Sequence, residues 1–123
     1  MKKVLIQDKT LSLPALDSIK DLVQADFEGR FEIEIAQCLA ENNLDITKYS
    51  LIISHPHIYQ NCCPPQILRA DENNIPIILT YKVMTKEVEE LRAIWDKFDI
   101  PLRRRELGHQ FYIDVIKSLE GKI

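Results

Sequence analysis

The hydrophobic and polar positions of the sequence follow two different rhythms, which predict β-strands and α-helices in turn. Residues 4–6 form an apolar run that ends at polar residues 7–9, the pattern of a buried strand that meets a loop. Apolar and charged residues alternate over 31–35, as in a strand at a sheet edge with one solvated face. Further strands are predicted at 49–53, 75–79 and 100–102.

Apolar residues at helical spacing separate these strands. Thr85 is a residue type that caps helix N-termini, and Gly121 is one that ends helices. The sequence therefore alternates strand and helix five times. The helices are expected at 14–27, around 38–39, and at 66–71, 85–98 and 109–121.

Such an alternation predicts an α/β fold in which helices cover both faces of a parallel sheet. We expect five strands in the doubly wound, flavodoxin-like order 2-1-3-4-5. In folds of this class, ligands and chemistry gather at the carboxyl ends of the strands, near the point where the strand order reverses. The segments of interest are therefore 7–10, 54–57, 80–82 and 102–105.

Length and composition narrow the choice of function. The chain has 123 residues, of which 46% are hydrophobic, so we expect a single domain over 1–123. A net charge of -3 disfavours nucleic acid as a partner, because nucleic-acid binders rely on a positive field. The apolar runs fall far short of the ~20 residues of a membrane helix, and Asp8 cuts off a signal-like start. Three cysteines are too few for a disulfide scaffold and agree with a reducing, cytoplasmic location.

Four segments of the chain carry a family resemblance: 3–8 (KVLIQD), 51–54 (LIIS), 68–71 (LRAD) and 74–80 (NIPIILT). Through them the chain resembles the receiver domain of response regulators, the phosphoacceptor module of two-component signalling, over essentially its whole length. The family pattern has two acids after the first strand, a phosphorylated Asp after the third, Thr or Ser after the fourth and Lys after the fifth. In the family these residues carry magnesium-assisted phosphoryl transfer.

This sequence departs from the family pattern where that chemistry occurs. Asp8 matches the first acid and Thr80 the switch hydroxyl, but Lys9 stands at the second acid and Ser54 at the phosphoacceptor. Mg²⁺ needs hard oxygen ligands, and the Lys9 ammonium could instead pair with Asp8. A serine hydroxyl without an adjacent base is a poor nucleophile. We therefore expect a pseudo-receiver with no catalytic residue, no metal site and no cofactor.

The family lysine position falls within residues 103–105. Arg103 is the choice by its distance from Thr80, with a register that can slip by one residue. The arginine run itself has three interpretations: a solvated strand end, an anion site in the crevice, or a patch for an acidic partner.

A pseudo-receiver signals by binding, so the sequence predicts a phosphorylation-independent regulatory module that acts through protein–protein interaction. In receivers, the fourth helix, fifth strand and fifth helix form the surface on which partners and dimer mates dock. The resemblance implies that this surface lies at 87–98 and 102–112, and a homodimer through the same face is expected. Its interface-type residues are Trp95, Arg104, Arg105 and Tyr112.

Two other interpretations stay open. One is a flavodoxin-like domain whose strand ends match the receiver pattern by coincidence, acting as a small enzyme or ligand-binding domain in the crevice. Its polar groups would include Asp8, Ser54, His55 and Thr80, although chain neighbours such as Ser54 and His55 usually point apart. The other is phosphorylation at an unorthodox residue.

The remaining histidines and cysteines give weak signals. His55 and His57 flank a proline without further ligands at a zinc-site spacing, so we expect loop-surface histidines. Cys62 and Cys63 are adjacent, which suits small buried hydrophobes better than a redox pair. The three glycines are not clustered, which weighs against a nucleotide or flavin loop.

Overall fold

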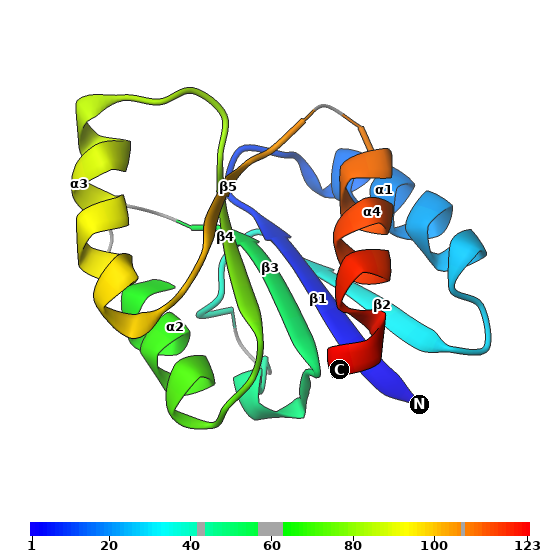
Figure 1. The fold of residues 1–123 in the computed structure, drawn as a ribbon. Helices are drawn as coiled ribbons and strands as arrows, with labels where there is room; N and C mark the ends of the chain where they lie inside the picture. Colours follow the sequence, from blue (N-terminus) through cyan, green and yellow to red (C-terminus); the bar gives the residue numbers. More distant parts are fainter. Residues whose placement is uncertain (42–43, 57–62, 107) are drawn as a thin grey trace.

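The computed structural model describes residues 1–41, 44–56, 63–106 and 108–123. Its strands are parallel and form one five-stranded sheet in the order β2-β1-β3-β4-β5 (Figure 1). The predicted fold class is therefore confirmed. The strands are β1 (Lys2–Asp8), β2 (Phe31–Ala36), β3 (Leu51–His55), β4 (Ile77–Tyr81) and β5 (Leu102–Arg104).

Four α-helices and three short 3₁₀ helices accompany the strands in the described part of the chain. The predicted cap at Thr85 is confirmed, since its hydroxyl accepts a hydrogen bond from the Val88 backbone N–H at 3.2 Å. None of the described helices has the length and apolar character needed to cross a membrane. The α-helices are α1 (Leu13–Asp26), α2 (Cys63–Glu72), α3 (Lys86–Trp95) and α4 (Gln110–Leu119), and the 3₁₀ helices are η1 (Ile46–Lys48), η2 (Asp96–Phe98) and η3 (Glu120–Lys122).

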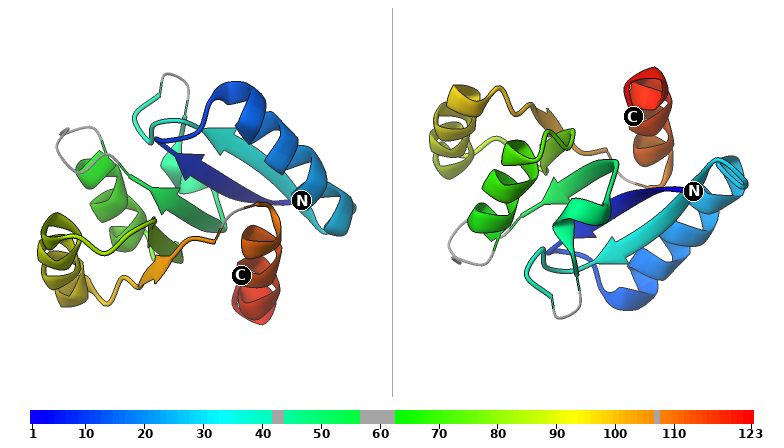
Figure 2. Two further views of the ribbon diagram at one scale, coloured as in Figure 1. Left: turned by 90° about the horizontal axis from the view of Figure 1, so that it is seen from above. Right: turned by 90° about the horizontal axis from the view of Figure 1, so that it is seen from below.

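The helices cover both faces of the sheet. Helices α1 and α4 lie on one face, and α2 and α3 on the other (Figure 2). Successive strand residues point to opposite faces, so each face receives its own apolar core. The first core includes Val4, Ile6, Phe27, Ile53 and Ile116, and the second Leu5, Ile52, Ile67, Leu79 and Trp95.

The prediction of an α-helix around residues 38–39 is wrong. The Glu41 carboxylate accepts the backbone N–H groups of Gln37 and Cys38, at 2.8 and 3.1 Å, which holds this segment in a turn. Leu39 is fully buried in the second core, together with Ile46 of η1. Leu39 and Ile46 therefore pack in the second core without an α-helix around residues 38–39.

The last strand begins two residues later than the sequence predicts. Pro101 has no N–H to donate to a ladder, although its carbonyl accepts from the Leu79 N–H at 3.0 Å. Ladder pairing with β4 starts at Leu102 and continues through Arg103 and Arg104. The shift changes which arginine lies beyond the strand end.

Candidate functional site

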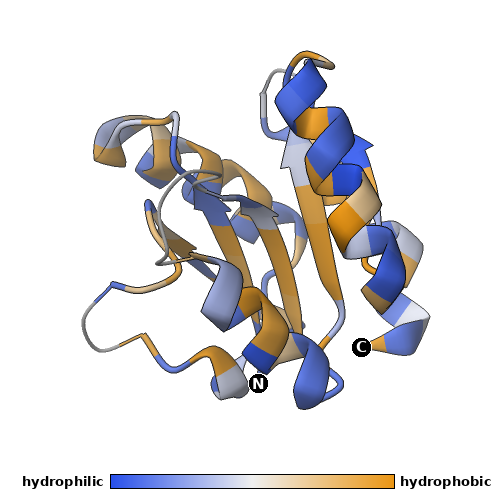
Figure 3. Cartoon of the chain, turned by 90° about the vertical axis from the view of Figure 1, so that its left-hand side faces the viewer, coloured by the Kyte–Doolittle hydropathy of each residue, from blue (hydrophilic) through white to orange (hydrophobic). Residues whose placement is uncertain are grey.

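The strands are hydrophobic through their middle and turn hydrophilic towards their carboxyl ends (Figure 3). At those ends Asp8 of β1 pairs in register with His55 of β3, and Gln7 pairs with Ser54. Because side chains alternate, Asp8 and His55 point to the α1 and α4 face, whereas Gln7 and Ser54 point to the α2 and α3 face. The strand ends therefore build two separate polar clusters, one on each face.

Asp8 is the centre of the first cluster and is fully buried. Its Oδ1 accepts hydrogen bonds from the Thr10 backbone N–H at 2.8 Å and from the Thr10 hydroxyl at 2.6 Å. Its Oδ2 lies 2.9 Å from Nε of Arg105, in an ion pair that lacks the angle of a hydrogen bond. Both carboxylate oxygens are therefore engaged by the protein itself.

Arg105 enters this cluster from the residue that follows β5. Its backbone N–H donates to the Tyr81 carbonyl at 2.8 Å, which fixes the point where the side chain departs. The side chain is only 2% exposed, and its Nη2 lies 3.4 Å from the Thr10 hydroxyl. A guanidinium buried this deeply requires an anion beside it, and Asp8 supplies one.

Tyr112 of α4 closes the first cluster. It is buried, and its hydroxyl lies within the electrostatic influence of Arg105 and Asp8. Burial raises the pKa of Tyr112 above its usual value, and the charge of Asp8 adds to the rise, while Arg105 opposes it. The hydroxyl therefore stays protonated beside the ion pair.

His55 lies next to the ion pair, with its Nδ1 3.9 Å from Oδ2 of Asp8. The side chain is 10% exposed, and Nδ1 has no hydrogen-bond partner among the residues that the structure describes. Burial lowers the pKa of His55 to about 4; Asp8 opposes this shift, whereas nearby cations, led by Arg105, add to it. The imidazole is therefore neutral at pH 7.

The second cluster joins Gln7 and Ser54. The Ser54 backbone carbonyl links it to Thr80, whose side chain points to the α1 and α4 face. The Ser54 hydroxyl donates to Oε1 of Gln7, and the Thr80 hydroxyl donates to the Ser54 carbonyl at 3.3 Å. Nε2 of Gln7 donates to the Gln37 carbonyl at 2.8 Å and to the His55 carbonyl at 3.1 Å. Since Ser54 bonds to Gln7 and the His55 imidazole points to the other face, these two residues do not form a nucleophile and base.

The residues predicted for the degenerate phosphoacceptor pocket are only partly brought together. Asp8 and Thr80 lie at the carboxyl ends of β1 and β4, on the same face of the sheet, with β3 between them. The backbone N–H of half-buried Lys9 donates to the His55 carbonyl at 3.2 Å. Ser54 faces the opposite side of the sheet. The ion pair of Asp8 forms with an arginine instead of with Lys9.

Arg103, the predicted occupant of the family lysine position, lies outside the first cluster. It is exposed, and its guanidinium carbon is 5.9 Å from the centre of the Phe111 ring. Arg105 is on the same face two residues later, and it is the arginine that reaches Asp8. The sequence prediction placed Ser54 and Arg103 beside Asp8, whereas His55 and Arg105 are the residues that lie there.

The four residues predicted for a partner surface do not share one surface. Arg104 is exposed, but Arg105 and Tyr112 are buried in the first cluster, so their predicted exposure is wrong. Trp95 is 3% exposed and packs between α3 and α2. These three side chains face inward because they fill the two cores and the buried ion pair.

The described residues offer no metal centre. They contain no group of three or more His, Cys, Asp or Glu side chains placed to hold an ion. Cys63 is buried in the second core, and its Sγ lies 4.0 Å from Sγ of Cys38. His57 and Cys62, the other members of the predicted pairs, lie outside the described residues.

Comparisons with known proteins find similarity in structure but not in sequence. No protein-family model matches this sequence, and no curated protein matches it. The ChxR receiver domain from Chlamydia trachomatis superposes with a TM-score of 0.61 at 12% identity, covering 99% of this chain and 100% of that chain. The receiver domain of the Francisella response regulator 1452 gives 0.57 at 17%, covering 99% and 98%. The chain therefore has the fold of a response-regulator receiver domain.

Proposed function

We propose that this chain is a receiver-type signalling module that works without phosphorylation, by binding a protein partner, and that it catalyses no reaction. The observation that carries the proposal is the buried ion pair of Asp8 and Arg105. The guanidinium lies against the carboxylate that, by the family resemblance, would hold a metal ion. The positive charge at this position thus comes from the chain itself.

The donor set around Asp8 does not suit Mg²⁺. This ion takes oxygen ligands in a near-octahedral shell at about 2.0–2.1 Å and relies on carboxylates. Oδ1 already accepts two hydrogen bonds from Thr10, and Oδ2 contacts Arg105. A dication bound to Asp8 would lie within a few ångströms of the guanidinium, in a buried place where like charges repel strongly. We therefore assign no metal to this cluster.

The end of β3 also lacks the acid that phosphoryl transfer requires. His55 is the residue beside Asp8, and its imidazole is 10% exposed. Ser54 points to the other face, and its hydroxyl donates to Gln7. Neither side chain supplies the carboxylate of an aspartyl phosphate, which supports a module that does not use that switch.

Magnesium with beryllofluoride, and separately acetyl phosphate, test the proposal on the intact chain. We expect no saturable shift in the amide spectrum, no change in Trp95 emission and no mass gain of one phosphoryl group. A phosphorylatable receiver domain treated in parallel shows that the reagents are active. A saturable, magnesium-dependent shift centred on Asp8 and Thr80 would refute the proposal.

Protein binding has its own test. Affinity capture from the native host should retain the same partner whether or not acetyl phosphate and magnesium are present. Sedimentation of the isolated chain tests the predicted homodimer through α3, β5 and α4. The cytoplasmic location, which also stays a prediction, is tested by fractionation of the host cell.

A further inference from the structure

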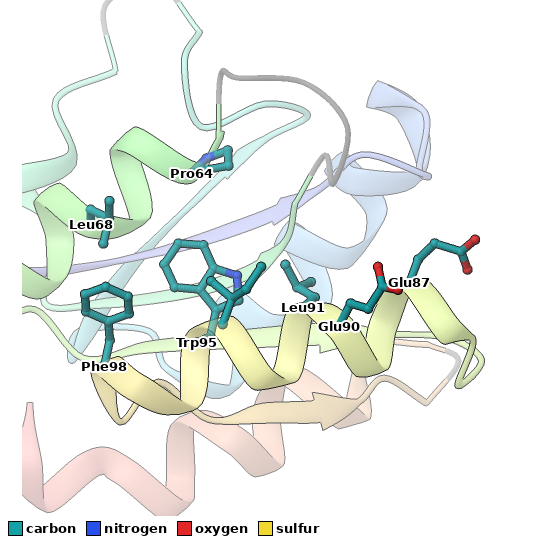
Figure 4. Close-up of a pocket in the computed structure, with 8 residues that line it drawn as sticks. Pro64, Leu68, Glu87, Glu90, Leu91, Trp95 and Phe98 are labelled. Carbon is teal, nitrogen blue, oxygen red and sulfur yellow. The ribbon is translucent and has the colours of Figure 1, made fainter.

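A groove of about 420 Å³ runs between α2 and α3 (Figure 4). Its walls are apolar, and the indole of Trp95 lies across it between the two helices. The groove is remote from the Asp8 ion pair, which is on the other face of the sheet. Eight residues line it: Pro64, Leu68, Glu87, Glu90, Leu91, Ile94, Trp95 and Phe98.

Helix α3 leaves much of its apolar side chain surface uncovered. Of its ten residues, Val88 and Trp95 are buried and Leu91 is half-buried. Ile94 is 51% exposed and Phe98, just beyond the helix, is 40% exposed. Two large apolar side chains that line one groove are thus open to solvent, which is typical of a surface that binds another molecule.

The two charged residues that line the groove are both acidic. Glu87 and Glu90 are exposed and are three positions apart on α3, so they lie on one side of the helix. An apolar floor with an acidic rim is complementary to an amphipathic segment whose polar flank is basic. A symmetric contact between two copies would instead bring the acidic rims together, which disfavours a second copy of this chain as the occupant.

The length of the groove fits a short helix. Residues 87–98 extend for roughly 16 Å at the rise of an α-helix, which equals about three helical turns of a partner. Three turns present apolar side chains at positions i, i+3 or i+4, and i+7 to such a groove. We infer that the α2–α3 groove binds a basic amphipathic helix of a partner protein. This inference rests on the proposed function, because it names the class of partner for a module that acts by binding.

A designed helical peptide tests the groove, with Leu at i, i+4 and i+7 and Lys on both flanks. Trp95 is the single tryptophan of the sequence and lines this groove, so a peptide that binds here should change its emission. We expect a saturable emission change and amide shifts confined to residues 64–68 and 87–98. The same peptide with Glu in place of Lys should bind at least about tenfold more weakly at low salt, which is 1.4 kcal/mol.

Matched variants separate the rim charge from the overall charge. Glu90→Lys should weaken binding of the Lys peptide about tenfold, whereas Glu89→Lys, an exposed position on α3 that does not line the groove, should change it less than about twofold. Ile94→Ala should weaken binding of both peptides. These positions are exposed, so unchanged thermal unfolding confirms that each variant folds.

Several results would overturn the inference. They are no saturable response to the Lys peptide, equal binding of the Glu peptide, equal losses in Glu89→Lys and Glu90→Lys, or a dimer that Ile94→Ala dissociates. Binding of a small apolar dye in the groove without peptide binding would also overturn it, in favour of a small-molecule pocket. A failed peptide titration together with a silent beryllofluoride experiment would remove the groove assignment and leave the phosphorylation-independent function in place.

Discussion

Replacing Arg105 with Met tests the ion pair on which the proposed function depends. Met keeps an unbranched apolar side chain at this position but removes the guanidinium. Asp8 would remain fully buried, with Thr10 still donating to Oδ1 and no cation against Oδ2. The variant therefore isolates the cost of one buried carboxylate that has lost its partner.

The expected loss follows from the depth of burial. Breaking a buried ion pair by removing one partner costs about 3–5 kcal/mol of the free energy of unfolding. The two remaining hydrogen bonds from Thr10 place Arg105→Met near the lower end, at about 3 kcal/mol. For a domain of this size, that loss lowers the Tm by roughly 10 °C. The exposed neighbour provides the control, since Arg104→Met should change the stability by less than about 0.5 kcal/mol.

Asp8→Asn and the double variant complete a thermodynamic cycle. Asp8→Asn leaves a guanidinium that is 2% exposed without its anion, so it should also cost about 3 kcal/mol. If the two residues act as a unit, the double variant costs at least about 2 kcal/mol less than the sum of the single variants. Urea unfolding followed by Trp95 emission measures all four proteins. Additive single costs, or an Arg105→Met cost no larger than that of Arg104→Met, would refute the reasoning.

Three further predictions concern the same structure. The pKa of His55 is about 4 when folded and 6.5 when unfolded, so between these values the unfolded chain binds a proton that the folded chain does not. The free energy of unfolding should therefore be unaffected by His55 above pH 6.5 and should fall by about 1–2 kcal/mol towards pH 4, after allowance for solvent screening. His55→Gln should flatten this part of the urea-derived profile, and an unchanged slope would contradict the assignment. Thr85→Ala removes the acceptor of the Val88 N–H and should cost about 1 kcal/mol in thermal unfolding, most of which Thr85→Ser should restore. Ser54→Ala leaves Oε1 of Gln7 without its donor and should cost about 1–3 kcal/mol in urea unfolding; a cost near zero would show that this hydrogen bond contributes nothing.

The fold could be predicted because its signals are local and repeated. Each buried strand is a short apolar run, and each long helix has apolar residues at helical spacing, so the α/β class follows from their sequence of appearance. The strand order was expected from the resemblance to receiver domains and the flavodoxin-like fold. The helix predicted around residues 38–39 is absent because the apolar residues there are buried by tertiary contacts, while the Glu41 carboxylate accepts the backbone N–H groups of Gln37 and Cys38 in a turn. Propensity alone does not distinguish such a turn from the start of a helix.

The candidate site was predicted less well because it depends on which face each side chain takes. The runs 4–6 and 51–53 are apolar on both faces, as expected for central parallel strands, so the sequence carries no period-two signal there. Without that signal, Ser54 and His55 cannot be assigned to their faces. The shift of β5 by two residues then placed Arg105, and not Arg103, against Asp8. An error of one or two residues in the predicted bounds of a strand is therefore enough to assign an exposed side chain to a buried position.

A regulatory domain needs two states that a ligand distinguishes by its binding free energy. In the receiver pattern, the metal ion and the phosphoryl group come from solution and can leave again. Arg105 is part of the chain, held at the end of β5 by its backbone hydrogen bond to Tyr81, so its charge cannot leave for solution as a metal ion can. In the proposed function, the choice between states must therefore be made elsewhere. By the inference above, a partner helix covers Ile94 and Phe98, which it can do only in a state in which α3 leaves them exposed. Binding in the α2–α3 groove would thus favour that state over one in which these side chains are covered, and this difference in binding free energy is what a signal requires.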